Sequence, residues 1–208
     1  MGNSLIPSRD MKVRASTPDI KVEYFSEEEI ERMRKWIEFN FNPERTVKRF
    51  RHDQRSRYEI LFEFLLRTGG RISEILDMTY KDVDTFTETV RIRTLKRKRE
   101  VYRTIPLHPD LKKVFSIYSS GRRKSGKDEK VFPMSRQAVD EFLKRMQKDL
   151  GFRIHAHKFR HTFAVKALMD GVPLNIVQKW LGHSSVFTTS VYTDVTGMDT
   201  REWMGRIK

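Results

Sequence analysis

Cysteine and long apolar runs are both missing from this sequence, and each absence excludes a class of protein. With no cysteine among its 208 residues, the chain has no disulfide framework, no thiolate zinc site and no cysteine nucleophile. No segment approaches the roughly 18 consecutive apolar residues of a membrane span, and the first residues lack the apolar core of a signal peptide. We therefore expect a cytoplasmic protein with no membrane partner.

Positive charge is what the sequence has in excess. The 42 Lys and Arg residues outnumber the 28 Asp and Glu residues, which leaves a formal charge of +14. A field of this size attracts polyanions before any specific contact forms, so nucleic acid is the partner that the charge favours. A merely well-solvated basic surface and an anionic membrane surface are the alternatives.

The first residues differ in composition from the rest. Residues 1–22 contain Pro7 and Pro18 among serines and scattered charges, with no apolar period, which predicts a linker or a flexible N-terminal arm. The 38% hydrophobic content is enough to bury a core. We expect that core in one folded domain over residues 23–208.

Apolar periodicity predicts a mostly α domain with one small antiparallel β-sheet, an α+β fold. Ser26 with Glu29 three residues later forms a capping box, so a helix should begin there. Helices are expected at about 26–39, 57–68, 71–76, 109–118, 135–150, 157–169, 173–180 and 184–191. Two β-prone segments, at 89–93 and 101–105, flank a basic turn and should pair as the sheet.

Two motifs place arginines where helices start. Arg71 follows two glycines at a corner between helices, where Glu74 on the same face could orient its guanidinium. His157 and Arg160 are three residues apart and share one face of a predicted helix. Each pair alone is also compatible with ordinary surface residues.

Two further motifs follow in the second half of the chain. His183 follows Leu-Gly at another corner, and Tyr192 follows Thr-Thr-Ser-Val. A single tyrosine is usually a packing residue, and His-x-x-Arg occurs a second time at 52–55, so no motif is decisive by itself. Their joint occurrence in one fixed order is the informative observation.

In this order the motifs resemble those of tyrosine recombinases and phage-type integrases. The matching elements are Thr-Gly-x-Arg-x-Ser-Glu, Ile-Pro-Leu after a basic turn, His-x-x-Arg-His-Thr-Phe-Ala, Leu-Gly-His-Ser and Thr-Thr-x-x-Tyr, over about residues 25–195. The resemblance implies the catalytic-domain fold of that family and an active site of Arg71, His157, Arg160, His183 and the nucleophile Tyr192. The family's active-site lysine falls in the turn at 94–100, where Lys96 and Lys98 are both candidates and Lys96 is nearer the strand end.

The chemistry of DNA strand exchange explains these residue types. Arg71 and Arg160 can neutralise the charge that builds up on the non-bridging phosphate oxygens. A phenol with a pKa of about 10 needs a proton acceptor, and His157 is the candidate for Tyr192. Lys96 suits protonation of the departing 5′ oxygen as a general acid.

Metal and cofactor chemistry is not expected. The carboxylates at 27–29 look like an exposed helix start, and no carboxylate cluster suggests a divalent ion. We therefore expect activity that survives EDTA. A phosphotyrosine retains the energy of the bond it replaces, so no ATP or other cofactor is implied. In the same site, His183 would donate a hydrogen bond to the phosphoryl oxygen.

Basic residues crowd the predicted hairpin and one loop. The candidate phosphate contacts are Arg91, Arg93, Arg97, Lys98, Arg99 and Arg103 in the hairpin, and Arg122, Arg123 and Lys124 in the loop. Such contacts add affinity with little sequence readout. Either group could instead be a solvated face.

The resemblance predicts a site-specific recombinase or integrase, of the kind that mobile genetic elements carry. It is expected to work as a homo-oligomer (dimer to tetramer) on double-stranded nucleoid DNA in the cytoplasm. Relatives commonly carry an N-terminal core-binding domain, and with only about 22 residues before the predicted fold we expect that domain to be absent. A type IB topoisomerase and a non-catalytic DNA-binding module are the rival interpretations. Whether Tyr192 acts in its own subunit or in its neighbour's stays open. The DNA sequence that the protein recognises and its biological role, whether integration, excision or the resolution of chromosome dimers, stay open too.

Overall fold

The computed structural model describes residues 22–41, 51–94, 101–120 and 126–182. Its elements are α1 (Glu27–Asn40), α2 (Arg51–Thr68), α3 (Ile72–Leu76), the 3-10 helix η2 (Tyr80–Asp82), β1 (Val83–Asp84), β2 (Thr89–Arg93), β3 (Tyr102–Pro106), α4 (Pro109–Ser120), α5 (Arg136–Leu150), α6 (Ala156–Met169) and α7 (Leu174–Leu181). The predicted α+β fold class is confirmed, with a three-stranded antiparallel sheet. None of the described helices is long and apolar enough to cross a membrane.

The first helix begins where its capping box predicts. The Ser26 hydroxyl accepts a hydrogen bond from the Glu29 backbone N–H at 3.1 Å, and the Glu29 carboxylate accepts one from the Ser26 backbone N–H at 3.0 Å. These bonds satisfy two N–H groups at the start of α1. Helix α2 begins at Arg51, earlier than predicted, because residues 51–56 contain no apolar residue and so give no periodic signal.

The predicted hairpin forms, and a third strand joins it. In the antiparallel pair β2–β3, Val90 lies opposite Ile105. Alternation buries Val90 and exposes Arg91, as expected for a sheet with one face on the core. Strand β1 pairs with β2 through Val83 and Asp84. The sequence pattern did not predict β1 because a strand of 2 residues has no measurable period.

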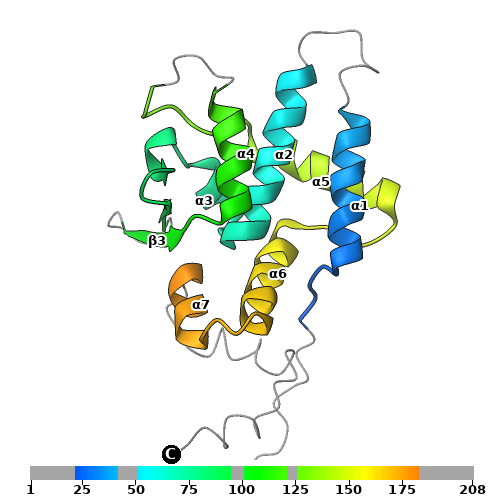
Figure 1. The fold of residues 1–208 in the computed structure, drawn as a ribbon. Coiled ribbons are helices and arrows are strands. Elements are labelled where there is room, and N and C mark those ends of the chain that lie inside the picture. Colours follow the sequence, from blue (N-terminus) through cyan, green and yellow to red (C-terminus); the bar gives the residue numbers. More distant parts are fainter. Residues whose placement is uncertain (1–21, 42–50, 95–100, 121–125, 183–208) are drawn as a thin grey trace, which may run out of the picture.

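Helix α2 lies at the centre of the molecule, between α1 and α4, with α6 and α7 beyond its C-terminal end (Figure 1). Phe62 of α2 meets Phe159 of α6 edge-on, with ring centroids 5.5 Å apart. Phe159 also packs on Phe25 at 4.9 Å and is only 1% exposed. These contacts fix the helix with the His-x-x-Arg motif against the helix that precedes Arg71.

A smaller apolar cluster joins α6 to α7. Val165, Val177 and Leu181 are fully buried in it. Val22, which we assigned to the N-terminal arm, is 8% exposed and belongs to the same cluster. The chain is therefore already packed one residue before the expected start of the domain.

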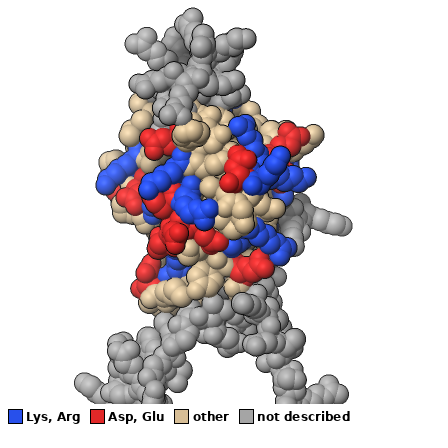
Figure 2. Space-filling model, turned by 90° about the vertical axis from the view of Figure 1, so that its right-hand side faces the viewer, with Lys and Arg blue, Asp and Glu red and all other residues tan. Residues whose placement is uncertain are grey.

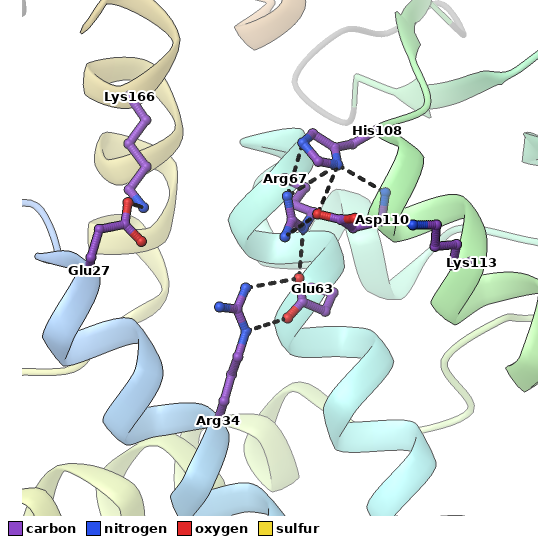
Figure 3. Close-up of polar contacts among 8 residues, drawn as sticks. All are labelled: Glu27, Arg34, Glu63, Arg67, His108, Asp110, Lys113 and Lys166. Carbon is purple, nitrogen blue, oxygen red and sulfur yellow. Dashed lines mark hydrogen bonds and ion pairs between the residues drawn. The ribbon is translucent and has the colours of Figure 1, made fainter. Parts of the chain in front are cut away.

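Ion pairs brace the helices on the outside of the molecule (Figure 3). Glu63 of α2 accepts from Arg34 of α1 at 2.9 Å and from Arg67 at 2.7 Å. Lys166 of α6 pairs with Glu27 of α1. Partly exposed pairs of this kind contribute at most about 1 kcal/mol each, so the apolar core contributes more than this network to holding α1, α2 and α6 together.

Candidate active site

The structure describes part of the predicted site. Arg71, Glu74, His157 and Arg160 are among the described residues, as are Arg91, Arg93 and Arg103. The other predicted residues lie outside the described residues: Lys96, Arg97, Lys98, Arg99, Arg122, Arg123, Lys124, His183 and Tyr192. Their roles, the helix expected at 184–191 and the choice between Lys96 and Lys98 stay predictions.

Arg71 lies at the corner between α2 and α3. Gly69 adopts a left-handed φ of +59°, and Arg71 is the N-cap residue of α3. The Arg71 guanidinium donates to Glu74 Oε1 at 3.0 Å, and its backbone N–H donates to Glu74 Oε2 at 3.0 Å. The expected contact between the two residues is therefore present, and 29% of the Arg71 side chain remains exposed.

Glu74 is buried and holds a second guanidinium. Arg103 of β3 donates from Nη2 to Glu74 Oε2 at 2.6 Å. Burial raises the pKa of Glu74, but the hydrogen bond and charge of Arg103, together with the contacts from Arg71, outweigh it and hold the pKa below its usual 4.5. Glu74 is therefore ionised at neutral pH and shared between two arginines.

Arg103 is not at the surface, where we expected a DNA contact. Its side chain is 7% exposed, and besides Glu74 it donates to the carbonyl oxygen of Trp180 at 2.7 Å. A buried guanidinium paired with a carboxylate cannot turn to a phosphate without leaving that carboxylate unpaired. The prediction of Arg103 as a phosphate contact is wrong, because strand alternation puts it on the same inward face as Ile105.

Arg160 links two helix ends. It is 1% exposed, and its Nη1 donates to the Gly69 carbonyl while its Nη2 donates to the Leu181 carbonyl, both at 2.7 Å. Carbonyls at helix C-termini lack partners within the helix and carry partial negative charge, so a cation is well placed there. The contact with Gly69 brings Arg160 to the corner that holds Arg71.

Histidines gather at the start of α6. His155 is the N-cap residue, and its Nδ1 accepts from the Lys158 backbone N–H at 3.3 Å. His157 is exposed, and its ring meets that of His161 edge-on with centroids 4.5 Å apart. The proposed proton acceptor therefore sits at an accessible helix end with a second imidazole beside it.

The charges of both arginines affect the pKa of His157. Partial burial and then the charges of Arg160, His155 and Arg71 lower the pKa of His157 below its usual 6.5. A neutral imidazole near two guanidiniums can accept a proton at neutral pH. Arg160 reaches the Arg71 corner through its contact with the Gly69 carbonyl, and His157 lies close enough for the charges of both arginines to lower its pKa.

The lowered histidine pKa values should make the protein less stable in acid. Burial, followed by the charges of its neighbours, lowers the pKa of His161 to about 4. The unfolded chain, with an ordinary histidine pKa of about 6.5, takes up that proton first, so the free energy of unfolding should fall as pH drops from about 6.5 towards 4. In urea unfolding at several pH values, His161→Gln should lose less stability over this window than the wild type. Parallel curves for the two proteins would contradict this.

The Gly69 corner should not tolerate a side chain. A Cβ there would lie 2.4 Å from Phe163 Cδ1 and 2.8 Å from Leu181 Cδ2, at a φ of +59°. We expect Gly69→Ala to lower the free energy of unfolding by about 3 kcal/mol, because backbone strain and overpacking add.

A matched glycine separates the two causes. Gly151, the C-cap of α5, also has a left-handed φ, of +77°, but a Cβ there would meet no atom within 4 Å. Gly151→Ala should therefore cost only the backbone strain, about 1 kcal/mol. Equal losses in urea unfolding for the two variants would show that the Gly69 corner is not tightly packed.

Two of the expected DNA contacts lie on the outer face of β2. The side chains of Arg91 and Arg93 are 49% and 41% exposed. Arg91 lies over the ring of Tyr102 at 4.7 Å and pairs with Asp82 at 3.6 Å, while Arg93 pairs with Asp77 at 3.3 Å. Both guanidiniums are therefore accessible in part, and a role in DNA binding stays a proposal.

The side of the molecule that carries α1 and part of α5 has mixed charge. Figure 2 shows acidic and basic side chains interspersed there. On α1, Lys35 pairs with Glu31 at 3.7 Å. The excess positive charge of the chain is thus not gathered on this side.

Comparison with known proteins identifies relatives. The model of the Phage integrase family matches residues 23–198. Tyrosine recombinase XerA of Saccharolobus solfataricus is 30% identical over 148 residues, which make up 71% of this chain and 49% of that protein. The chain spans about half the length of the curated relatives it matches.

Solved structures share the fold. The catalytic domain of bacteriophage HP1 integrase superposes with a TM-score of 0.63 at 20% identity, over 89% of this chain and 95% of that chain. XerH site-specific recombinase bound to difH substrate gives a TM-score of 0.59 at 22% identity, over 89% of this chain and 53% of that chain. The family match includes the Arg71 corner and the helix of His157 and Arg160. The chain therefore belongs to the phage integrase family, the tyrosine recombinases.

Proposed function

We propose that this protein is a site-specific DNA recombinase or integrase that cleaves and rejoins DNA strands through a 3′-phosphotyrosine at Tyr192. The supporting observation is the convergence of Arg71, Arg160 and His157 at the corner between α2 and α3. Two guanidiniums and a neutral imidazole suit an anionic phosphodiester that must be attacked by a group losing a proton. Membership of the tyrosine recombinases supports the same chemistry.

In the proposed reaction one ester bond replaces another. The Tyr192 oxygen forms a bond to phosphorus while the bond from phosphorus to the 5′ oxygen breaks. His157 takes the phenolic proton, and Lys96, or Lys98 in its place, gives a proton to the departing 5′ oxygen. A 5′-hydroxyl of another strand then attacks the phosphotyrosine and restores the DNA backbone.

The remaining residues stabilise charge. Arg71, whose side chain is partly exposed, neutralises the non-bridging oxygens of the pentacovalent phosphorus, and Arg160 adds its positive charge at the same corner. His183 donates a hydrogen bond to one of these oxygens. Because the phosphotyrosine keeps the energy of the broken bond, we propose that ATP takes no part. Because the arginines supply the positive charge at the phosphate, we propose the same for a metal ion. Cleavage is accordingly expected in the presence of EDTA.

The proposed partner is double-stranded DNA, bound by a homo-oligomer between a dimer and a tetramer. The XerH structure is that of a recombinase bound to its difH substrate, and the Tn1549 transposon integrase was solved in complex with circular intermediate DNA. Activity on nucleoid DNA in the cytoplasm, in integration, in excision or in the resolution of chromosome dimers, is part of the same proposal.

A suicide substrate tests the proposal. On DNA nicked just downstream of the cleavage site, the short fragment that carries the released 5′-hydroxyl diffuses away, so the strand cannot be resealed and the covalent intermediate accumulates. The proposed function predicts a protein–DNA adduct that resists denaturation and forms on particular sequences. An adduct that forms without sequence preference would favour a type IB topoisomerase, and binding without any adduct would favour a DNA-binding module.

Basic residues of the hairpin turn should set the salt dependence of DNA binding. If Arg97 and Arg99 contact phosphates, Arg97→Ala with Arg99→Ala should reduce the slope of log K against log salt by about 2. Lys35→Ala with Arg136→Ala removes the same charge from exposed positions of α1 and α5 that are paired with acidic residues, and should leave the slope nearly unchanged. An unchanged slope in the first variant, measured by fluorescence anisotropy, would refute the assignment.

A further inference from the structure

Arg103 connects elements that are far apart in the sequence. Its Nη2 donates to Glu74 across 29 residues, and its Nε donates to the Trp180 carbonyl across 77 residues. The side chain is 7% exposed. A buried guanidinium with two such contacts is held in one orientation, so Arg103 has a fixed place between β3, α3 and α7.

The shared carboxylate has a consequence for Arg71. If the buried Glu74 carboxylate were paired with Arg71 alone, it would neutralise the positive charge of the Arg71 guanidinium and keep that group in the ion pair. The contact of Glu74 with Arg103 is shorter, at 2.6 Å, than its contact with the Arg71 guanidinium, at 3.0 Å. Arg103 therefore balances the negative charge of Glu74. The partly exposed member of this network is Arg71, whose charge remains available to an anion.

The other end of Arg103 lies at the C-terminus of α7. Arg103 donates a hydrogen bond to the Trp180 carbonyl, and Arg160 donates one to the carbonyl of the next residue, Leu181. Gly182 caps the helix with a φ of +65°, and a Cβ there would lie 3.0 Å from Arg103 Cδ. Two buried arginines thus hold consecutive carbonyls at the point where the chain leads towards His183.

We propose that Arg103 is a positioning residue for DNA cleavage, which balances Glu74 so that Arg71 faces the phosphate and which fixes the end of α7. It does not touch the DNA. This role rests on the proposed strand cleavage. It differs from the phosphate contact first expected of Arg103, because it acts on the rate at which bound DNA is cleaved and leaves the affinity for DNA almost unchanged.

A charge-balance cycle tests the role. In Arg103→Gln, the unbalanced charge of Glu74 draws the Arg71 guanidinium away from the phosphate. The single-turnover rate of cleavage at saturating suicide substrate should therefore fall about 100-fold. The Kd for DNA should stay within about threefold of the wild-type value. Adding Glu74→Gln removes the unbalanced charge. The double variant should cleave at least about tenfold faster than Arg103→Gln, at a rate close to that of Glu74→Gln alone.

Controls separate this role from a loss of fold. Arg136→Gln removes an arginine from the exposed face of α5 and should cleave as the wild type does. Thermal melting checks that Arg103→Gln folds. If it does not, Arg103→Lys, which keeps the buried charge but loses the planar fork, should still fold and cleave about tenfold more slowly.

The outcomes that overturn the proposal are distinct. Wild-type cleavage of bound DNA by a folded Arg103 variant would remove the positioning role, and so would a loss that Glu74→Gln fails to recover. A flatter salt slope for Arg103→Gln with normal cleavage of bound DNA would restore the phosphate contact. A wild-type protein that forms no adduct on any DNA would overturn the proposed function itself, and with it the role of Arg103.

Discussion

Tyr192→Phe is expected to abolish the covalent protein–DNA adduct while leaving DNA affinity within about twofold of the wild type. Phenylalanine keeps the ring but has no oxygen to bond to phosphorus, so the first chemical step has no nucleophile. The loss should be at least about 10³-fold and limited by the detection of the adduct. Denaturing gels of the suicide-substrate reaction, with anisotropy on the same DNA, measure both quantities.

A second tyrosine provides the control. Tyr80 is partly buried against the core, and within the described part of the chain its hydroxyl has no hydrogen-bond partner. Tyr80→Phe should therefore keep fold, affinity and adduct formation, since it removes only an unsatisfied polar atom. A persistent adduct in Tyr192→Phe, or its loss in Tyr80→Phe, would show that the wrong tyrosine was assigned.

Arg71→Lys should lower the cleavage rate by about 10² to 10³, which is the second large effect we expect. Lysine keeps the charge but cannot donate two parallel hydrogen bonds to phosphate oxygens as they become more negative. The stability should change little, because Arg103 still balances Glu74 and 29% of the Arg71 side chain is exposed. Single-turnover rates at saturating DNA, together with thermal melting, measure the two effects.

The matched change is Arg136→Lys on α5. Arg136 is paired with an acidic neighbour, as Arg71 is, but it lies on the exposed face of α5. Its replacement should leave cleavage unaltered. If Arg71→Lys also cleaves at the wild-type rate, the guanidinium at this corner does not hold the reacting phosphate, and the roles of Arg71 and Glu74 need another explanation.

Local signals made most elements predictable. The capping box of α1 and the bounds of β2 follow from residues within one turn or one strand, and both match the structure. The early start of α2 and the short strand β1 were not predictable in this way. The first six residues of α2 are all polar and β1 has only 2 residues, so neither leaves a periodic pattern.

The site shows the same division between local and distant contacts. The Arg71–Glu74 pair was predictable because the two residues are 3 apart and both belong to the start of one helix. The role of Arg103 depends on partners 29 and 77 residues away, which no local pattern reveals. One available signal was overlooked: alternation with Ile105 places Arg103 on the inward face of β3.

Two residues of the same sequence motif, His157 and Arg160, differ in how far they are buried. His157 and Arg160 were expected to share a helix face, yet His157 is exposed and Arg160 is 1% exposed. The difference arises because the ends of α2 and α7 close over Arg160 through the Gly69 and Leu181 carbonyls. Tertiary packing of two helix ends, and not the motif spacing, decides which of the pair is buried.

Peptide mapping of the trapped adduct tests the central claim most directly. Trypsin should release a peptide that spans residues 180–201, in which Tyr192 is the one tyrosine. Mass spectrometry after nuclease digestion should find this peptide carrying a nucleotide through its 3′ phosphate. A nucleotide on any other peptide, or one joined through its 5′ phosphate, would contradict strand cleavage by Tyr192.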